Sequence, residues 1–284
     1  MSAIPPPTPT TLTIGGLDLY IFGLPEPNSE TTYTAYNVVF HAHGRGWTAE
    51  QDFPFCRGLC ERINEGNPTT RTLVATFDQR NHGRRLLSGK QNTSWKENND
   101  THAMDMFAMQ YGTACDVSFL IDVLPCYLPG RVEKWGMCGI SLGGHSTFLA
   151  LALDPRLTVG VPIIGCGDFL TLMTGRAAHM SPPIPLPPHS EKYINAALLK
   201  VLKDRDPINK VDEMRGKAIL IYSGAADTLV PASANIALVD KLTRAYEADG
   251  KAEMFRQIVE EGAKHELTEG MKRECAAWFR RWLA

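Results

Sequence analysis

The sequence predicts an α/β fold, a mostly parallel central sheet flanked by helices. Short, predominantly apolar runs rich in Val, Ile, Phe and Tyr alternate with longer helical patterns along nearly the whole chain, which is the order of strands joined by crossover helices. Such runs suit strands that are buried on both faces. The 284 residues suit a single domain, residues 1–284, because α/β folds reach roughly 250 residues as one unit.

The elements follow one another in a regular order. After a Pro-rich start, residues 11–23 predict an antiparallel edge hairpin with Gly15 and Gly16 near its turn. The runs predicted as further strands lie at 37–41, 72–77, 132–140, 157–166, 218–223 and 254–259. The stretches predicted as helices lie at 48–64, 104–124, 143–153, 233–248 and 267–283. In the last helix, apolar residues recur at spacings of three and four, which predicts one stripe packed on the sheet.

Residues 169–216 interrupt this order, because they are far longer than an ordinary connection between strands. Their cluster of prolines predicts an extended, stiff stretch, and residues 193–202 predict a short helix. We expect this segment to be a lid, inserted after the sixth strand.

Charge and composition limit the class of partner. The formal net charge of −2, with Lys and Arg scattered along the chain, supplies no basic surface for nucleic acid or an anionic membrane. No apolar run approaches the roughly 18 residues that span a bilayer, and the first residues lack a signal peptide's features. The seven dispersed cysteines resemble buried thiols rather than a disulfide framework. We expect a cytoplasmic protein with a small-molecule substrate, and the sequence leaves its oligomeric state open.

The strongest functional signal is Gly139-Ile140-Ser141-Leu142-Gly143, which stands between a predicted strand and a predicted helix. A serine at so sharp a turn projects its hydroxyl out of the sheet, and the flanking glycines leave room for the turn. The backbone N–H of Leu142, at the start of the helix, is placed to bind an oxyanion. This context predicts that Ser141 is a nucleophile rather than a helix cap.

A nucleophilic serine needs a base, and the base needs a carboxylate that orients it. His265 follows the last predicted strand and precedes the final helix, and so completes the chain order of serine, acid and histidine. Asp227 follows the strand at 218–223, at the edge of the sheet where Ser141 is expected. Asp168, which ends an earlier strand, is the alternative acid, and position favours Asp227.

The segment from His41 to Trp47 is the predicted source of a second oxyanion donor. Gly44 and Gly46 allow it to turn, so that the backbone N–H of Arg45 or Gly46 can face the site. We expect His43 and Gly44 to border the substrate, with His43 also holding the loop. A metal bound by His41 and His43 is the alternative, but no third ligand stands nearby, so we predict no metal and no cofactor.

Charged residues also follow the strand at 72–77. In Asp78-Gln79-Arg80, an ion pair between Asp78 and Arg80 inside a turn is the favoured interpretation, and binding of an anionic substrate is the alternative. The polar stretch 86–100, which contains Trp95, is expected to overhang the mouth of the site.

The chain resembles the α/β-hydrolase superfamily, in the branch of esterases and dienelactone-hydrolase-like or prolyl-oligopeptidase-like enzymes. The resemblance spans about residues 37–284 and rests, in chain order, on the His43-Gly44 loop, the Asp78-Gln79-Arg80 turn, the Ser141 segment, and the Asp227 and His265 segments. It implies the fold of that superfamily and hydrolysis that depends on Ser141. Two departures are Arg45, where many relatives carry a small or apolar residue, and Asn81-His82, which replaces a glycine-containing turn.

These residues predict a serine hydrolase that cleaves carboxylic esters of small molecules through an acyl-enzyme on Ser141. Apolar residues at the start of the expected lid are predicted to line the substrate pocket, namely Phe169, Leu170, Leu172 and Met173. The same machinery would also serve a peptide, thioester, lactone or carbon–carbon bond. A ligand-binding protein on this fold, without turnover, is the alternative from another class.

Overall fold

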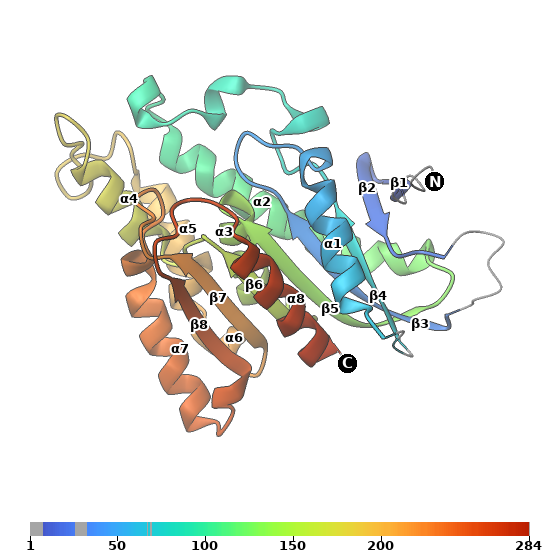
Figure 1. Cartoon of the computed structure of the whole chain (residues 1–284). Coiled ribbons are helices and arrows are strands. Elements are labelled where there is room, and N and C mark those ends of the chain that lie inside the picture. The colour runs from blue at the N-terminus through green and yellow to red at the C-terminus, as the bar shows by residue number, and fades with distance from the viewer. Residues whose placement is uncertain (1–7, 26–32, 67, 69, 284) are drawn as a thin grey trace.

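An eight-stranded sheet runs through the middle of the protein (Figure 1), in the order β1-β2-β4-β3-β5-β6-β7-β8. The computed structural model describes residues 8–25, 33–66, 68 and 70–283. β1 (Thr10–Ile14) and β2 (Leu17–Phe22) form an antiparallel hairpin at one edge, and β2 is also antiparallel to β4. The other strands are parallel to one another and comprise β3 (Ala35–Ala42), β4 (Arg71–Thr76), β5 (Arg131–Ile140), β6 (Leu157–Ile163), β7 (Ala218–Gly224) and β8 (Phe255–Glu260).

The predicted α/β class, the edge hairpin and each predicted strand are therefore confirmed. The start of the chain, residues 1–7, with most of the predicted Pro-rich stretch, lies outside the described residues. Every residue of β3 and of β7 is buried, which explains why those strands are apolar on both faces.

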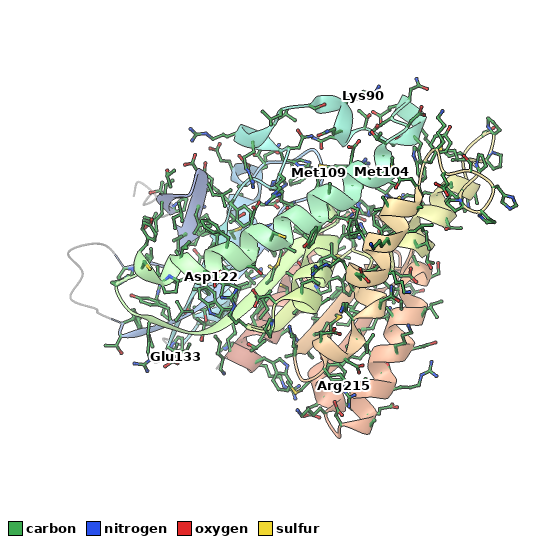
Figure 2. All side chains as sticks on the ribbon, turned by 180° about the vertical axis from the view of Figure 1, so that it is seen from behind. Lys90, Met104, Met109, Asp122, Glu133 and Arg215 are labelled. Carbon is green, nitrogen blue, oxygen red and sulfur yellow. The ribbon has the colours of Figure 1, made fainter. Side chains whose placement is uncertain are left out.

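Helices cover the two faces of the sheet unequally. α1 (Phe53–Ile63) and α8 (Glu269–Leu283) pack on one face. The other face carries α2 (His102–Val123), α3 (Leu142–Leu153) and α7 (Ile236–Ala248). Figure 2, a view from behind, shows α2 crossing this second face between Met104 and Asp122. Each of these helices was predicted, because its buried side chains form an apolar stripe or an apolar surface that needs a partner.

Short 3-10 turns complete the framework. They are η1 (Glu50–Asp52), η2 (Gly83–Arg85), η3 (Gly89–Asn92), η4 (Trp95–Glu97), η5 (Leu124–Cys126), η6 (Pro207–Asn209), η7 (Ala232–Asn235) and η8 (Ala252–Met254). Among the helices of the residues described above, none combines the length and the apolar character needed to cross a bilayer.

The connection between β6 and β7 contains more helix than the sequence predicted. It holds α4 (Phe169–Ala178), α5 (Ala196–Arg205) and the short α6 (Val211–Met214). α5 corresponds to the helix predicted at 193–202, whereas α4 was not predicted. Residues 179–195, which carry the proline cluster, form neither helix nor strand. That this connection acts as a lid stays a prediction.

This connection lies against the polar stretch 86–100. The rings of Trp95 and Tyr193 are 6.1 Å apart between centroids in an edge-on arrangement, and Lys192 Nζ lies 3.0 Å from a carboxylate oxygen of Asp100. Both segments stand at the carboxyl end of the parallel strands, the end at which open α/β sheets bind ligands.

Candidate active site

Ser141 occupies the turn between β5 and α3 with φ of 55° and ψ of −108°, a backbone conformation that is unfavourable for a residue other than glycine. The neighbouring glycines make the turn possible. A Cβ on Gly139 would lie 2.2 Å from the carbonyl oxygen of Gly143, and a Cβ on Gly143 would lie 1.9 Å from that of Ala42. The Ser141 N–H donates to the Ile163 carbonyl oxygen at 2.9 Å. Close packing therefore fixes the serine in a strained turn.

The structure brings Ser141, His265 and Asp227 together from three separate loops. Ser141 Oγ lies 2.8 Å from His265 Nε2, and His265 Nδ1 lies 2.7 Å from Asp227 Oδ2. The Asp227 side chain is fully buried, while 23% of the His265 side chain is exposed. With Nδ1–H donating to the carboxylate, the free Nε2 is able to accept the serine proton, which is the arrangement a nucleophilic hydroxyl requires.

Asp227 is held in its ionised form by its hydrogen bonds. Oδ1 accepts from the backbone N–H groups of Leu229 and Val230, both at 2.9 Å. Burial alone raises the pKa of Asp227, but the hydrogen bonds from His265, Val230 and Leu229 outweigh burial and lower the pKa below its ordinary value. The carboxylate is therefore negative at neutral pH and favours the imidazolium that forms when His265 takes a proton.

Backbone contacts lock the Asp227 turn against the His265 loop. The N–H of Ala226 donates to the carbonyl oxygen of Ala263 at 2.9 Å. At the end of β7, a Cβ on Gly224 would lie only 2.4 Å from the same oxygen. The close approach of these two backbones explains why a glycine precedes the turn.

Asp168, the alternative acid, has a different task. It is the N-cap of α4: its Oδ1 accepts from Thr171 N–H at 3.0 Å and its Oδ2 from the Thr171 hydroxyl at 2.8 Å. The structure thus places Asp227, and not Asp168, on His265.

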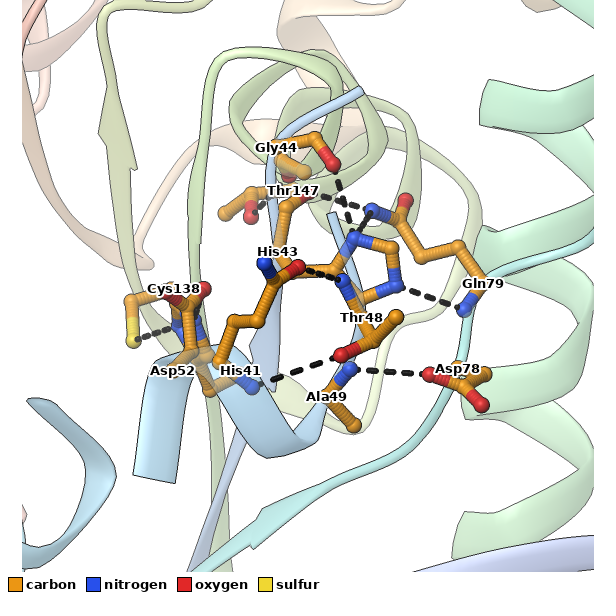
Figure 3. Close-up of polar contacts among 12 residues, drawn as sticks. His41, His43, Gly44, Thr48, Ala49, Asp52, Asp78, Gln79, Cys138 and Thr147 are labelled. Atoms are coloured by element: carbon orange, nitrogen blue, oxygen red, sulfur yellow. Dashed lines mark hydrogen bonds and ion pairs between the residues drawn. The ribbon is translucent and has the colours of Figure 1, made fainter. Parts of the chain in front are cut away.

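A buried network holds the predicted oxyanion loop beside the start of α3 (Figure 3). His43 Nδ1–H donates to the Gly44 carbonyl oxygen at 2.8 Å, and its Nε2 accepts from Gln79 N–H at 3.1 Å. The His43 carbonyl oxygen accepts from Gly143 N–H at 3.1 Å and from the Gln79 side-chain amide. These contacts hold the segment that contains Arg45 against the first turn of α3, which begins at Leu142, where backbone N–H groups have no partner within the helix.

His43 is therefore a residue that holds the loop, as the sequence suggested, and it does not contact the substrate space. Its side chain is fully buried and lines neither of the cavities at the site, whereas Gly44 lines the smaller one. Burial lowers the pKa of His43 to about 4, so the ring is neutral and serves as one donor and one acceptor. The sequence did not show that Gln79 would be its partner, because that contact joins the segments that follow two different strands, β3 and β4.

The predicted ion pair between Asp78 and Arg80 is wrong. Asp78 instead accepts from the backbone N–H groups of Ala49 and Arg84, each at 2.8 Å. Arg80 and Arg85 both pair with Asp116 of α2, at 2.9 and 2.8 Å. The turn is thus tied to its neighbours in space, and the sequence could not show those neighbours.

Two neighbouring cavities lie at the site, and Ser141 lines the smaller of them. The smaller, of about 210 Å³, is lined by Gly44, Trp47, Ser141, Ile164 and His265, among others. The larger, of about 860 Å³, lies between the 86–100 stretch, α4 and the segment after β7. Arg45 and Leu229 line both, so the two spaces are neighbours.

Phe169 and Met173, which were predicted to line the pocket, lie elsewhere. Both are buried in the core on the inner side of α4 and line neither cavity. Leu172, which was predicted with them, does line the larger cavity, together with Arg176 of the same helix, whereas Leu170 lines neither cavity. Because no helix was predicted here, the sequence could not tell which side chains face inward.

The histidines considered as metal ligands have protein partners. His41 Nε2 lies 2.7 Å from Asp52 Oδ2, and both side chains are buried (Figure 3). Within the described part of the chain, no three His, Cys, Asp or Glu side chains gather in a way that would hold a metal ion.

Comparison with known proteins places this site in a family. Residues 130–284, more than half of the chain, match the prolyl oligopeptidase family. The match includes the segments of Ser141, Asp227 and His265. The chain belongs to the prolyl oligopeptidase family. With its sheet and helices arranged as described, this member of the family is an α/β-hydrolase, as the resemblance implied, and a serine hydrolase of the esterase and peptidase kind.

A relative of this prolyl oligopeptidase family member comes from Bacillus subtilis (strain 168) and is named "Putative esterase YitV". The two are 26% identical over 155 residues, which are 54% of this chain and 58% of YitV. The match thus spans little more than half the length of that relative.

Solved structures share the fold over nearly the whole chain. TT1662 from Thermus thermophilus has a TM-score of 0.66 and 21% identity, with 97% of each chain covered. Est1E from Butyrivibrio proteoclasticus, solved with ferulic acid bound, has a TM-score of 0.58 and 16% identity over 96% of this chain and 98% of its own. The acylaminoacyl peptidase of Pyrococcus horikoshii has a TM-score of 0.60 and 13% identity over 98% of this chain but only 41% of its own. At these identities, the likeness establishes the fold.

Proposed function

We propose that this protein hydrolyses carboxylic esters of small molecules, with Ser141 as the nucleophile. The observation that carries the proposal is the continuous hydrogen-bond chain from Asp227 through His265 to the Ser141 hydroxyl, at 2.7 and 2.8 Å. The hydroxyl borders a cavity of about 210 Å³, which gives a small ester room to reach it.

In the first half of the proposed reaction, Ser141 Oγ attacks the ester carbonyl carbon and its proton passes to His265 Nε2. The carbonyl oxygen becomes an oxyanion, which the backbone N–H groups of Leu142 and Arg45 bind. Such a donor contributes about 3 kcal/mol to lowering a barrier in comparable enzymes. The bond to the alcohol oxygen then breaks, His265 gives its proton to the leaving alcohol, and the acyl group remains as an ester on Ser141.

In the second half, a water molecule attacks the acyl group and gives a proton to His265. The bond to Ser141 Oγ breaks, the proton returns to that oxygen, and a carboxylic acid leaves. Asp227 stays ionised throughout, and its low pKa suits a group that stabilises the imidazolium without taking the proton.

Peptide hydrolysis is the second candidate, because the family takes its name from a peptidase and an acylaminoacyl peptidase shares the fold. The same serine chemistry serves both bonds. Ester hydrolysis is favoured because YitV is named a putative esterase and Pf2001 of Pyrococcus furiosus, which shares the fold, is named an esterase. In addition, this chain spans only 41% of the peptidase chain.

We also propose that residues 169–216 act as a lid. α4, at the start of this segment, forms one wall of the larger cavity through Leu172 and Arg176. A displacement of the segment would therefore open that cavity to solvent.

The ester proposal is tested with p-nitrophenyl acetate, butyrate and octanoate, with amino-acid p-nitroanilides beside them. We expect the wild type to hydrolyse at least one ester and Ser141→Ala to lose about a thousandfold or more in kcat. The preferred length of the acyl chain indicates the size of the pocket that holds the acyl group. Turnover of the anilides with none of the esters would replace the ester proposal with the peptidase alternative.

A further inference from the structure

The larger cavity, which adjoins the one lined by Ser141, has an unusual electrostatic character. Its lining carries the cationic side chains Arg45, Lys96 and Arg176. The one carboxylate among its lining residues is Asp227, and that group is already bonded to His265. Cationic side chains therefore outnumber carboxylates in the lining, although the charges of Glu97 and Asp227 act on Arg45 and Arg176.

The two arginines make no ion pair with any carboxylate in the described ranges. Arg45 Nη1 donates to the Asn92 carbonyl oxygen at 3.2 Å. Arg176 donates to the Leu229 carbonyl oxygen through Nε at 3.4 Å and Nη2 at 3.1 Å. A guanidinium has five N–H donors, so each arginine keeps donors available after these backbone contacts.

Several other arginines of the protein are paired with carboxylates. Arg80 and Arg85 share Asp116, at 2.9 and 2.8 Å, and Arg156 lies 2.8 Å from Asp154. Arg45 and Arg176 differ from these three, because their hydrogen bonds go to backbone carbonyl oxygens. A partly buried guanidinium without a carboxylate is costly to desolvate, which favours a partner that arrives from solution.

The titration behaviour of the cavity agrees with its geometry. Burial, and after it the positive charge of Arg45, lowers the pKa of Arg176 to about 10. Burial, with the charges of Arg45 and Arg176, lowers the pKa of His102 to about 4. The two arginines therefore act on one another and on the same histidine, which places them around a common space.

We propose that Arg45 and Arg176 bind an anionic oxygen group of the substrate, a carboxylate or a phosphate, while its ester carbonyl lies at Ser141. The inference rests on the proposed ester hydrolysis and names its substrate class: esters that carry an acidic group at a distance from the scissile bond. Guanidinium groups match both anions in geometry and charge.

Two further features fit such a substrate. Arg45 lines both cavities, so this one residue is able to serve the proposed oxyanion position through its backbone N–H and the larger space through its guanidinium. Trp95, Leu172, Met180 and Leu229 provide apolar lining in that space, which suits the carbon skeleton between the ester and the acid.

The test compares esters that differ in charge. To place the acid in the acyl part, the p-nitrophenyl monoester of suberic acid is compared with its neutral match, p-nitrophenyl octanoate. To place the acid in the alcohol part, 4-carboxyphenyl acetate is compared with the neutral 4-(methoxycarbonyl)phenyl acetate. A third anionic ester, 4-phosphonooxyphenyl acetate, distinguishes a preference for phosphate from one for carboxylate. We expect at least one anionic ester to exceed its neutral match in kcat/KM by about tenfold or more, as a desolvated charge-assisted hydrogen bond would give.

The Arg176→Gln variant tests whether the larger cavity causes the preference for anionic esters. We expect it to remove most of the anionic-to-neutral ratio, Arg176→Lys to keep part of it, and the matched control Arg280→Gln to leave the ratio unchanged, because Arg280 pairs with Glu65 near the end of α8. No preference for any anionic ester, or a preference that survives in Arg176→Gln, would overturn the proposal. If the melting curve shows that Arg176→Gln does not fold, the same comparison is made with Arg45→Gln, which is expected to lose most of the anionic-to-neutral ratio of kcat/KM.

A direct measurement of anion binding tests this inference independently of the proposed ester hydrolysis. Calorimetry of Ser141→Ala with suberate and with inorganic phosphate measures anion binding without turnover. Binding that weakens about tenfold on adding Arg176→Gln supports the site even if no ester is hydrolysed, in which case the ester proposal alone has failed. Hydrolysis of neutral esters with no binding of either anion defeats the inference and leaves the ester proposal standing.

Discussion

At the scale of single residues, the site depends on polar groups whose partners come from distant parts of the chain. Ser141, Asp227 and His265 could be predicted, because each stands directly after a recognisable strand and their order along the chain is informative. Gln79 and Arg176 could not be assigned roles, since the contacts of Gln79 and the position of Arg176 on a cavity wall arise only in the folded chain.

The choice between the two candidate acids gives a prediction at this scale. Asp227→Asn keeps the shape of the side chain but removes the charge and favours the wrong tautomer of His265, so we expect kcat to fall by about a thousandfold to ten-thousandfold. The matched control is Asp168→Asn, which keeps an oxygen able to cap α4 and should retain activity within about threefold. Ester hydrolysis rates of the two variants measure the difference. A large loss in Asp168→Asn with little loss in Asp227→Asn would reverse the assignment of the acid.

At the scale of elements, the sequence predicted the strands well but missed two helices, α4 and the four-residue α6. Runs such as β3 and β7 are apolar because they are buried on both faces, so their composition identifies them. The sequence does not reveal α4, because its apolar residues also suit the lining of a pocket and a proline cluster follows it. Its start depends on Asp168 as a cap, and the position of Asp168 after a strand suits a catalytic acid equally well.

A buried pair that joins β3 to the turn before α1 gives a prediction about stability. His41 Nε2 lies 2.7 Å from Asp52 Oδ2. Burial lowers the pKa of His41, but hydrogen bonds with Asp52 and Cys138 outweigh it and raise the pKa from 6.5 to about 9. Because the folded state holds this proton more tightly than the unfolded state, the contribution is complete below about pH 6.5 and is lost as the pH rises toward 9.

We therefore expect the free energy of unfolding of the wild type to fall by roughly 1 to 3 kcal/mol more than that of His41→Gln between pH 6.5 and pH 9. Urea unfolding at several pH values provides the measurement. Asp52→Asn is a second variant that should flatten the same dependence. Parallel pH curves for all three proteins would show that the pair does not titrate as described.

At the scale of the whole molecule, the sheet explains how distant segments form one site. Parallel strands end at one edge, so the loops after β3, β5, β7 and β8 bring Arg45, Ser141, Asp227 and His265 together. The fold class was predictable because it follows from the alternation of strands and helices. The larger cavity was not, because its walls combine the 86–100 stretch, α4 and the segment after β7.

The family match covers the second half of the chain, whereas the larger cavity is lined by residues from both halves. Residues 130–284 match the family and contain the serine, the acid and the histidine. Arg45 and Trp95, which line the larger cavity, lie before that range. The residues proposed to carry the chemistry thus lie in the part shared with the family, and we expect substrate choice to depend strongly on the first half of the chain.

The most direct test of the central claim, an activated serine at position 141, is labelling with a fluorophosphonate probe followed by mass spectrometry of the modified peptide. We predict that the wild type is labelled on Ser141, that labelling is lost in Ser141→Ala and that it is slowed at least a hundredfold in His265→Gln, because the hydroxyl needs its base. The control Ser146→Ala should still be labelled. A wild-type protein that resists the probe, or that is labelled equally well after Ser141→Ala, would contradict the account.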